Sequence, residues 1–298
     1  MLTTFRRISL LALVALTPAA AQRPLKVYIS VDMEGIAGVV TAEQLGPTGF
    51  EYGRAREFMT AEVNAAIAGA RAAGATQFVV SDSHGNGQNL LIDQLPADVT
   101  IIRSWPRPLM MMEGIDSTFD AAFFIGYHAS TANANGVRAH TMSSATLTGV
   151  ALNGTQMPEG GVNAAIAGHF GVPVVLVTGD DAAVDEVRRI AGRMEGAVVK
   201  RAISFHAAAT LTPKASQDLI RERAKVAIEH RSDMRPFVLR GPVTLDVAFK
   251  NYRQAEMLAY LSIVERTSSH AIRFVGKNIL EVSKFMEFVN TYSPDLTP

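Results

Sequence analysis

Carboxylate and imidazole side chains follow three apolar segments of this chain, at the point where each segment ends. Asp32 and Glu34 follow KVYISV, His84 follows QFVVSD after one serine, and His128 follows AAFFIGY. Imidazole nitrogen combined with carboxylate oxygen, without thiolate, suits zinc, manganese, iron or cobalt in a hydrolytic site. A carboxylate such as Asp32 can also bridge two ions. These four residues are therefore predicted metal ligands.

The spacing of Asp32 and Glu34 favours a metal over simple helix capping. Side chains two residues apart lie on the same face of an extended backbone, and two carboxylates side by side repel each other unless a cation neutralises them. Each residue alone has an ordinary alternative: the acids as caps or turn residues, and His84 and His128 as a loop and a core histidine. Their joint occurrence at strand ends favours the metal site.

Two later segments add candidates. GVRAHTM places His140 after a loop of small residues, and MPEGGVNAAIAG places Glu159 at the start of an expected helix. The helix dipole favours an acid in the first turn by about 0.3–1 kcal/mol, so Glu159 has a purely structural alternative. An imidazole takes up and releases protons near neutral pH, and His140 is the predicted catalytic residue.

β-Branched segments alternate with alanine-rich ones along most of the chain. This pattern predicts an α/β fold with a largely parallel sheet covered by helices, in which functional side chains gather beyond the carboxyl ends of the strands. The expected strands are KVYISV, QFVVSD, VTIIRS, AAFFIGY, VPVVLVTG, AVVK and PVTLDVAF; the expected helices span 54–73, 161–169, 182–191 and 213–230. Asp180 and Asp181 are expected to cap the third of these helices.

The first 21 residues have the features of a secretory signal peptide: Arg6 and Arg7, an apolar run from Ile8 to Leu16, and an A-x-A site before Gln22. The apolar run is shorter than the roughly 20 residues that span a bilayer, although an uncleaved anchor is the alternative. We expect a periplasmic or secreted protein with no membrane attachment after cleavage. Residues 22–298 are the expected catalytic region, with a possible subdivision near residues 231–240.

Composition excludes several classes of function. The 298 residues include 28 basic and 28 acidic side chains and no cysteine. The sequence has no block of basic residues of the kind that binds a nucleic-acid backbone, so no nucleic-acid partner is expected. The absence of cysteine excludes a thiolate nucleophile and any disulfide. The sequence also lacks the G-x-S-x-G motif that is typical of many serine hydrolases.

Taken together, the motifs resemble the DppA-type D-aminopeptidases, a family of zinc metallopeptidases. The segments are VYISVDMEGIAGV, EYGRAREFMTAEVNAAIAGA, VSDSHG, MMEGIDSTFDAAFFIGYHA, GVRAHTM, PEGGVNAAIAGHFGVPVVLVTGDD and NYRQAEM. They occur in the family's order over about residues 25–291. The resemblance implies a DppA-like fold, two zinc ions per subunit, and a ring-shaped homo-oligomer such as a decamer.

The resemblance also implies roles for particular residues. The zinc ligands it implies are Asp32, Glu34, His84, His128 and Glu159. Asp32 would bridge the ions, and His140 would act as nucleophile or as proton carrier. The loop between His128 and His140 is slightly longer than the family pattern, and the signal peptide departs from the cytoplasmic members.

The expected activity is hydrolysis of short peptides or amides with an N-terminal D-amino acid such as D-alanine. Two alternatives remain open on the sequence. A metal-dependent phosphoesterase would use similar ligands, but it usually adds a basic clamp for phosphate, and Arg138 is the one basic residue near the candidate ligands. A non-enzymatic exported protein could also bind metal or peptide. The acid that would hold the substrate's ammonium group is not indicated.

Overall fold

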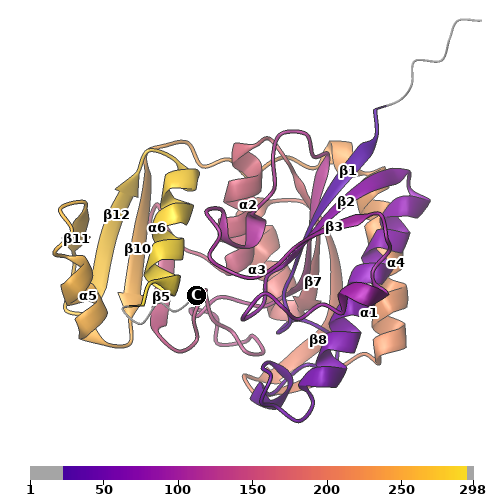
Figure 1. Cartoon of the computed structure of the whole chain (residues 1–298), viewed down its shortest axis with the longest axis horizontal. Coiled ribbons are helices and arrows are strands. Elements are labelled where there is room, and N and C mark those ends of the chain that lie inside the picture. The colour runs from indigo at the N-terminus through magenta and orange to yellow at the C-terminus, as the bar shows by residue number, and fades with distance from the viewer. Residues whose placement is uncertain (1–22, 294–298) are drawn as a thin grey trace, which may run out of the picture.

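The computed structural model describes residues 23–293, which are arranged around two sheets (Figure 1). The larger, seven-stranded sheet has the order β3-β2-β1-β4-β7-β8-β9. Its strands are β1 (Leu25–Val31), β2 (Ala75–Asp82), β3 (Val99–Ile102), β4 (Ala121–Tyr127), β7 (Val174–Asp180), β8 (Glu195–Ser204) and β9 (Ala207–Thr210). All neighbours are parallel except β8 and β9. The predicted signal peptide lies outside the described residues.

Helices cover both faces of this sheet. Figure 1 shows α1 (Tyr52–Ala72) and α4 (Pro213–Glu229) side by side on one face, with α2 (Glu159–His169) and α3 (Asp181–Ala191) on the other. Strands β4 and β7 are buried along their whole length, which explains why their sequences are continuously apolar rather than alternating. The predicted largely parallel α/β fold is confirmed.

The helix ends agree with the local sequence signals. Gly74 follows α1 with φ 95°, a left-handed conformation that glycine adopts without strain. Pro213 occupies the first turn of α4, where its missing N–H leaves no bond unmade. Asp180 caps α3 as predicted, because its Oδ1 accepts from the N–H of Ala183 at 2.7 Å. The neighbouring Asp181 instead accepts from the N–H of Ala202 at 3.1 Å.

The second sheet is antiparallel and was not anticipated as a separate layer. Its order is β11-β12-β10-β5-β6, with β5 (Leu147–Leu152), β6 (Thr155–Gln156), β10 (Val243–Phe249), β11 (Val264–Arg266) and β12 (Ala271–Gly276). Helices α5 (Tyr252–Leu258) and α6 (Ile279–Thr291) accompany it. The predicted strand PVTLDVAF is β10 and belongs here; its burial alternates, as in a sheet with one covered face.

Two stretches that are far apart in the chain build this second sheet. Residues 147–156 supply β5 and β6, and the other strands come after residue 242. The segment near 231–240 connects α4 and a short 3-10 turn to β10, and a subdivision there stays a prediction. Within residues 23–293, none of the helices is long and apolar enough to cross a bilayer.

Candidate metal centre

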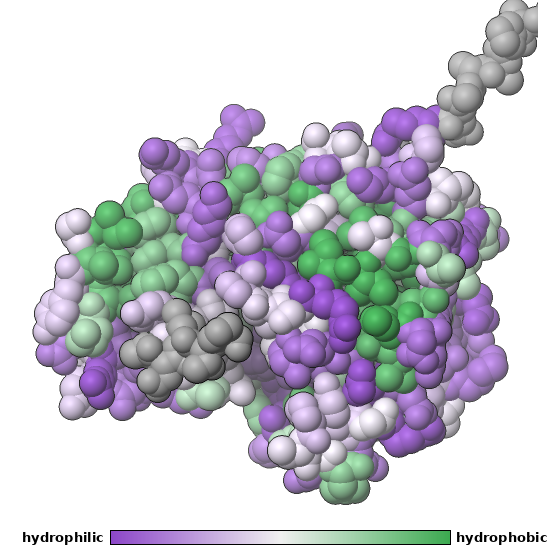
Figure 2. Space-filling view, in the orientation of Figure 1, coloured by the Kyte–Doolittle hydropathy of each residue, from purple (hydrophilic) through white to green (hydrophobic). Residues whose placement is uncertain are grey.

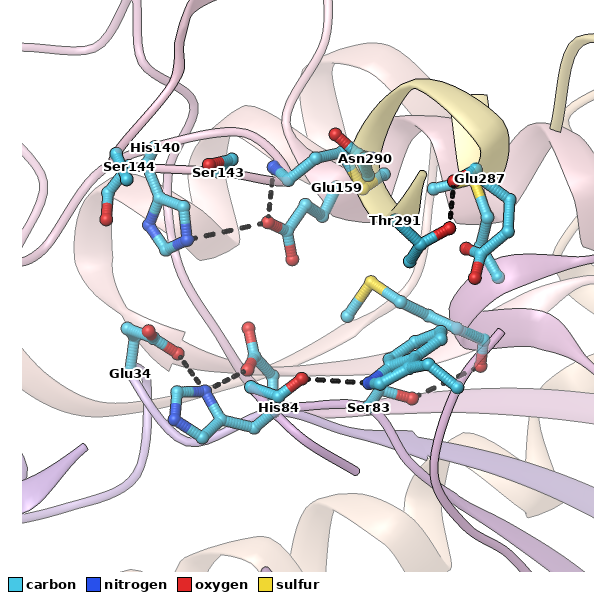
Figure 3. A pocket seen from close by; sticks show the side chains of 17 residues that line it. Glu34, Ser83, His84, His140, Ser143, Ser144, Glu159, Glu287, Asn290 and Thr291 are labelled. Carbon is cyan, nitrogen blue, oxygen red and sulfur yellow. Dashed lines mark hydrogen bonds and ion pairs between the residues drawn. The ribbon is translucent and has the colours of Figure 1, made fainter. Parts of the chain in front are cut away.

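The predicted site residues lie together beyond the carboxyl ends of β1, β2 and β4. Figure 3 shows Glu34 and His84 on one side of a pocket, with His140 and Glu159 opposite them. Asp32, Glu34, His84, His128 and Glu159 are all buried. The side chain of His140 is 15% exposed. The structure thus brings together residues that span about 130 positions of the sequence, because parallel strands end at a common edge.

A tight turn after β1 directs the first two acids. The N–H groups of Asp32 and Gly35 donate to the carbonyls of Ile125 and Gly126 in β4. A Cβ atom at Gly35 would lie 2.1 Å from the carbonyl oxygen of Tyr127, so only glycine allows this approach. The turn therefore places Asp32 and Glu34 directly above the β1–β4 pair.

His84 is oriented by a backbone carbonyl on its far side. Its Nε2 donates to the carbonyl of Leu45 at 2.8 Å. Its Nδ1 lies 3.1 Å from Asp32 Oδ1 and 2.9 Å from Glu34 Oε2. Metal-binding histidines commonly donate one ring N–H to a carbonyl and direct the other nitrogen at the ion, and His84 has this arrangement.

His128 repeats the arrangement on the other side of Asp32. Its Nδ1 donates to the carbonyl of Ala129 at 3.0 Å, and its Nε2 lies 3.2 Å from Asp32 Oδ2 and 3.4 Å from Glu159 Oε2. The two oxygens of Asp32 thus each face a different histidine. A carboxylate placed in this way can bridge two ions.

Several atoms at the centre of the cluster are buried without a hydrogen bond. Asp32 Oδ2, Glu34 Oε2 and His128 Nε2 have no partner of acceptable geometry, although other polar atoms lie nearby. Buried polar atoms are nearly always bonded, and convergent lone pairs of nitrogen and oxygen fit a metal such as zinc. The residues present therefore fit the predicted metal.

Two triplets have ligand atoms within 4.8 Å of one another: Asp32, Glu34 and His128, and His128, His140 and Glu159. Neither triplet includes His84, yet its Nδ1 is within 3.1 Å of both Asp32 and Glu34, so we group it with those acids. His140, the predicted catalytic residue, is close enough to the second triplet to act as a ligand instead.

His140 presents one nitrogen to the pocket. Its Nδ1 is 2.8 Å from the carbonyl of Arg138, which assigns the proton to Nδ1 and leaves a lone pair on Nε2. Nε2 lies 3.7 Å from Glu159 Oε1. Arg138 has a positive φ of 55°, and this turn directs its carbonyl at the ring. The lone pair of His140 is therefore held in the cavity.

Charge coupling in the cluster is strong. Burial and the neighbouring Glu34 carboxylate raise the pKa of Asp32. Burial opposes charge on Glu34, but the adjacent His84 holds the pKa of Glu34 well below its usual range. Burial likewise opposes charge on His84 and His128, yet the facing carboxylates raise the pKa of both rings well above the usual value. Without metal, protons on the imidazoles neutralise the acids; bound cations would replace those protons.

Comparison with known proteins places this geometry in a family. The family model described as D-aminopeptidase matches residues 25–288. The chain belongs to the D-aminopeptidase family. A D-aminopeptidase of Bacillus subtilis is 35% identical over 266 residues, which cover 88% of this chain and 95% of that protein. A solved structure, described as the Zn-dependent D-aminopeptidase DppA from Bacillus subtilis, a self-compartmentalizing protease, superposes with a TM-score of 0.85 at 33% identity.

That solved structure covers 89% of this chain and 96% of its own, so the family resemblance predicted from the motifs is confirmed over nearly the whole fold. The family consists of hydrolases that remove amino-terminal residues, and this chain is a homologue of a zinc-dependent member.

The pocket of this family member has a volume of about 350 Å³ and two unlike ends. One end lies at the ligand cluster, which consists of the candidate metal ligands Asp32, Glu34, His84, His128 and Glu159. The other end is formed by apolar side chains and by α6, and its lining residues are Met110, Met111, Glu287, Asn290 and Thr291. Figure 3 shows Glu287, Asn290 and Thr291 across the pocket from His84. Helix α6 is fixed there because Glu287 accepts from the N–H of Arg107 at 3.0 Å.

Asp82 ends a main-sheet strand but does not face the ligand cluster. Its carboxylate accepts from the N–H groups of Asn89 and Leu90 at 2.6 and 2.7 Å and from the side chain of Asn89 at 2.8 Å. It therefore orders the loop after His84, as short acidic side chains commonly do at turns. Nothing in the spacing of SDSHG distinguishes Asp82 from a ligand.

Sequence reasoning missed two contributors to the site of this D-aminopeptidase family member. Helix α6 arrives from the C-terminal end of the chain and carries no motif. Lys200 in β8 is 2% exposed and donates to carbonyls of the turn that carries Glu34. Burial lowers the pKa of Lys200 to about 8, so its amine is mostly protonated at neutral pH. AVVK reads as an ordinary strand end, and no local signal indicates this contact.

Proposed function

We propose that this protein is a zinc-dependent aminopeptidase that removes an N-terminal D-amino acid, such as D-alanine, from short peptides or amides. The observation that carries the proposal is Asp32 between two imidazoles, each with its far nitrogen bonded to a backbone carbonyl. The two relatives, a D-aminopeptidase and a Zn-dependent D-aminopeptidase, support both the metal and the substrate class.

The arrangement supports two ions. Asp32, Glu34 and His84 would hold one, and Asp32, His128 and Glu159 would hold the other. Zinc at these positions supplies a Lewis acid that polarises a carbonyl and lowers the pKa of water. Met142 donates its N–H to Glu159 Oε1 at 2.7 Å, which fixes that carboxylate and leaves Oε2 directed at His128.

His140 is the proposed proton carrier. Because Nδ1 is held by the carbonyl of Arg138, Nε2 can accept a proton from the attacking water and return it to the leaving amine without rotation of the ring. Stacking on His128 further restrains the ring. A nucleophilic role would use the same nitrogen. A ligand role is the competing assignment, and it would remove the lone pair from proton transfer.

The pocket fits a short substrate. A volume of about 350 Å³ is at the small end of the range for ligand sites, so a dipeptide or a small amide fills it. Trp105, Met110 and Met111 form an apolar part of the pocket lining, and Trp105 lies beside the ligand side of the pocket because its Nε1 donates to the carbonyl of Gly85 at 2.8 Å. We assign this apolar part to a substrate side chain, and the polar groups of α6 to the peptide backbone.

We also propose that the protein is exported and assembles with copies of itself. The N-terminal signal pattern supports a periplasmic or secreted location, where cell-wall peptides containing D-alanine are the available substrates. The description of a relative as self-compartmentalizing supports a homo-oligomer. Figure 2 shows hydrophobic residues at the end of the molecule formed by the second sheet, where Met257, Ile263 and Val275 are more than half exposed; such surfaces commonly mark interfaces.

The test is a direct comparison of substrates with the purified zinc-loaded protein. We expect release of p-nitroaniline from D-alanine p-nitroanilide, much slower release from the L-enantiomer, and no hydrolysis of p-nitrophenyl phosphate. Phosphate hydrolysis without amide hydrolysis would favour a phosphoesterase. Stoichiometric zinc with no hydrolysis of any D-aminoacyl amide or dipeptide would favour a binding protein.

A further inference from the structure

A buried lysine donates hydrogen bonds to the turn that carries Glu34. Lys200 lies in β8, and its side chain is directed at the turn formed by residues 34–39. Its Nζ donates to the carbonyl oxygens of Glu34, Ile36 (at 3.1 Å) and Val39. The turn and the lysine are more than 160 residues apart in the chain, so the contact depends on the completed sheet.

The bonding of this lysine is unusual for a buried charge. Buried lysines are rare and are normally paired with a carboxylate. In the described part of the chain, no carboxylate lies within ion-pair distance of Lys200. All three donors of the ammonium group go to carbonyls instead. Burial of a charged amine costs free energy, so an apolar side chain would serve better if Lys200 only filled space. What Lys200 adds is a set of hydrogen bonds that fixes the carbonyls of the turn.

Other contacts restrain the turn, but they hold different atoms. Glu62 Oε1 accepts from the N–H of Ala37 at 3.0 Å, and the hydroxyl of Thr210 accepts from the N–H of Gly38 at 2.8 Å. Lys200 binds the carbonyl of Glu34 itself. The N–H of Gly35, in the same peptide group, donates to the carbonyl of Gly126 at 2.7 Å. Lys200 is therefore the second of two contacts that fix the peptide plane next to the Glu34 side chain.

We propose that Lys200 is a positioning residue for the metal centre: it holds the 34–39 turn so that Glu34 faces Asp32 and His84, and it thereby sets the zinc affinity of that half of the site. The inference rests on the proposed function, because it takes those three residues as zinc ligands. Lys200 touches neither metal nor substrate and acts through the backbone of the turn.

The test compares Lys200→Met with Val199→Ala in the full-length mature protein. Methionine is similar in length to lysine but donates no hydrogen bond. Val199 is the fully buried neighbour in β8, and its apolar side chain makes no hydrogen bond to the turn, so its truncation lowers stability without removing a hydrogen bond from the turn. Zinc affinity is measured by competition with a chromophoric chelator, and stability by thermal unfolding of the metal-free proteins.

We expect Lys200→Met to bind one of its two zinc ions at least about tenfold more weakly, since outer-shell changes typically weaken metal binding by 10–100-fold. Excess zinc should then restore kcat, with KM unchanged. Val199→Ala should bind both ions as the wild type does, even if it unfolds at a lower temperature. Lys200→Gln keeps two donors and should fall between Lys200→Met and the wild type; it also serves if the methionine variant does not fold.

Each negative result would contradict a different part of the proposal. Wild-type zinc affinity in a folded Lys200→Met or Lys200→Gln protein would overturn the role of Lys200 alone. Equal weakening by Val199→Ala would overturn it as well, because the effect would then follow general stability. A wild-type protein that binds no zinc would contradict the proposed function, whatever the variants do.

Discussion

The imidazole rings of His128 and His140 stack face to face, with centroids 4.0 Å apart and planes 9° from parallel. His128 is buried and faces Asp32 and Glu159, whereas His140 is partly exposed to the pocket. A candidate ligand and the proposed proton carrier are thus in direct contact. This contact would place His140 beside the proposed ions without requiring that it bind them.

Substitution of His140 separates these two roles. We expect His140→Ala to retain both zinc ions and to lose about 10²–10⁴-fold in kcat, the usual contribution of general acid–base catalysis. Metal content by elemental analysis and turnover of D-alanine p-nitroanilide are measured on the same preparation. If zinc is lost together with activity, His140 belongs to the ligand shell.

The position of Asp32 between the two histidines predicts that both ions depend on it. Asp32→Asn should lower the zinc content from two ions to one or none and abolish turnover, because an amide bridges cations poorly. Asp180→Asn is the matched control: Asp180 also ends a main-sheet strand, but it bonds the N–H groups of Val137 and Ala183. Two ions of unchanged affinity in Asp32→Asn would contradict the bridging assignment.

Removal of metal should lower stability as well as activity. A ligand present at a free concentration 100 times its dissociation constant stabilises a protein by about 2.7 kcal/mol per site. Without metal, the cluster also contains buried polar atoms that have no hydrogen-bond partner. Dialysis against a chelator should therefore lower the unfolding temperature, and zinc should restore it more effectively than magnesium, which prefers ligand sets made only of oxygen. An unfolding temperature that is indifferent to chelator would argue against a metal centre.

Glu62 predicts a dependence of stability on pH that does not involve the metal ligands. It is buried on α1, and its Oε1 accepts from Ser216 at 2.6 Å and from the N–H of Ala37 at 3.0 Å. Burial raises the pKa of its carboxyl from 4.5 to about 7. The folded protein therefore holds this proton more tightly than the unfolded chain, and the resulting stabilisation, complete below pH 4.5, is lost as pH rises through 7.

Glu62→Gln keeps an acceptor at this position and does not titrate. Relative to the wild type, its free energy of unfolding should improve by about 3 kcal/mol between pH 4.5 and pH 8.5, at about 1.4 kcal/mol for each unit of pKa shift. Urea unfolding of both metal-free proteins at several pH values measures the difference, in which the titration of other groups cancels. A difference that stays constant with pH would show that Glu62 is ionised in the fold.

Much of this site could be predicted because strand ends carry positional information. The apolar runs before Asp32, His84 and His128 identify buried parallel strands, and the ends of such strands meet at one edge of a sheet. The same logic could not separate Asp82 from His84, since Asp82 is the last residue of β2 and His84 lies two residues beyond it. The hydrogen bonds from the N–H groups of Asn89 and Leu90 to Asp82 decide between them.

Contacts across long stretches of sequence were beyond prediction. The second sheet pairs β5 with β10 at a separation of about 90 residues, and β5 is short and followed by a two-residue partner, so neither segment identifies the other. Lys200 and α6 reach the site only after these layers have packed. Local patterns determine which elements form, whereas such contacts depend on how the completed elements meet.

The pocket is assembled from opposite ends of the polypeptide. The candidate ligands precede residue 160, whereas the opposing wall belongs to α6, whose residues begin at 279. Loss of α6 would keep every candidate ligand in the sequence but remove one wall of the pocket, together with the buried side chains of Ile279, Val282, Phe285 and Met286. Enclosure of a substrate therefore depends on a segment that begins more than 100 residues beyond the last candidate ligand, Glu159.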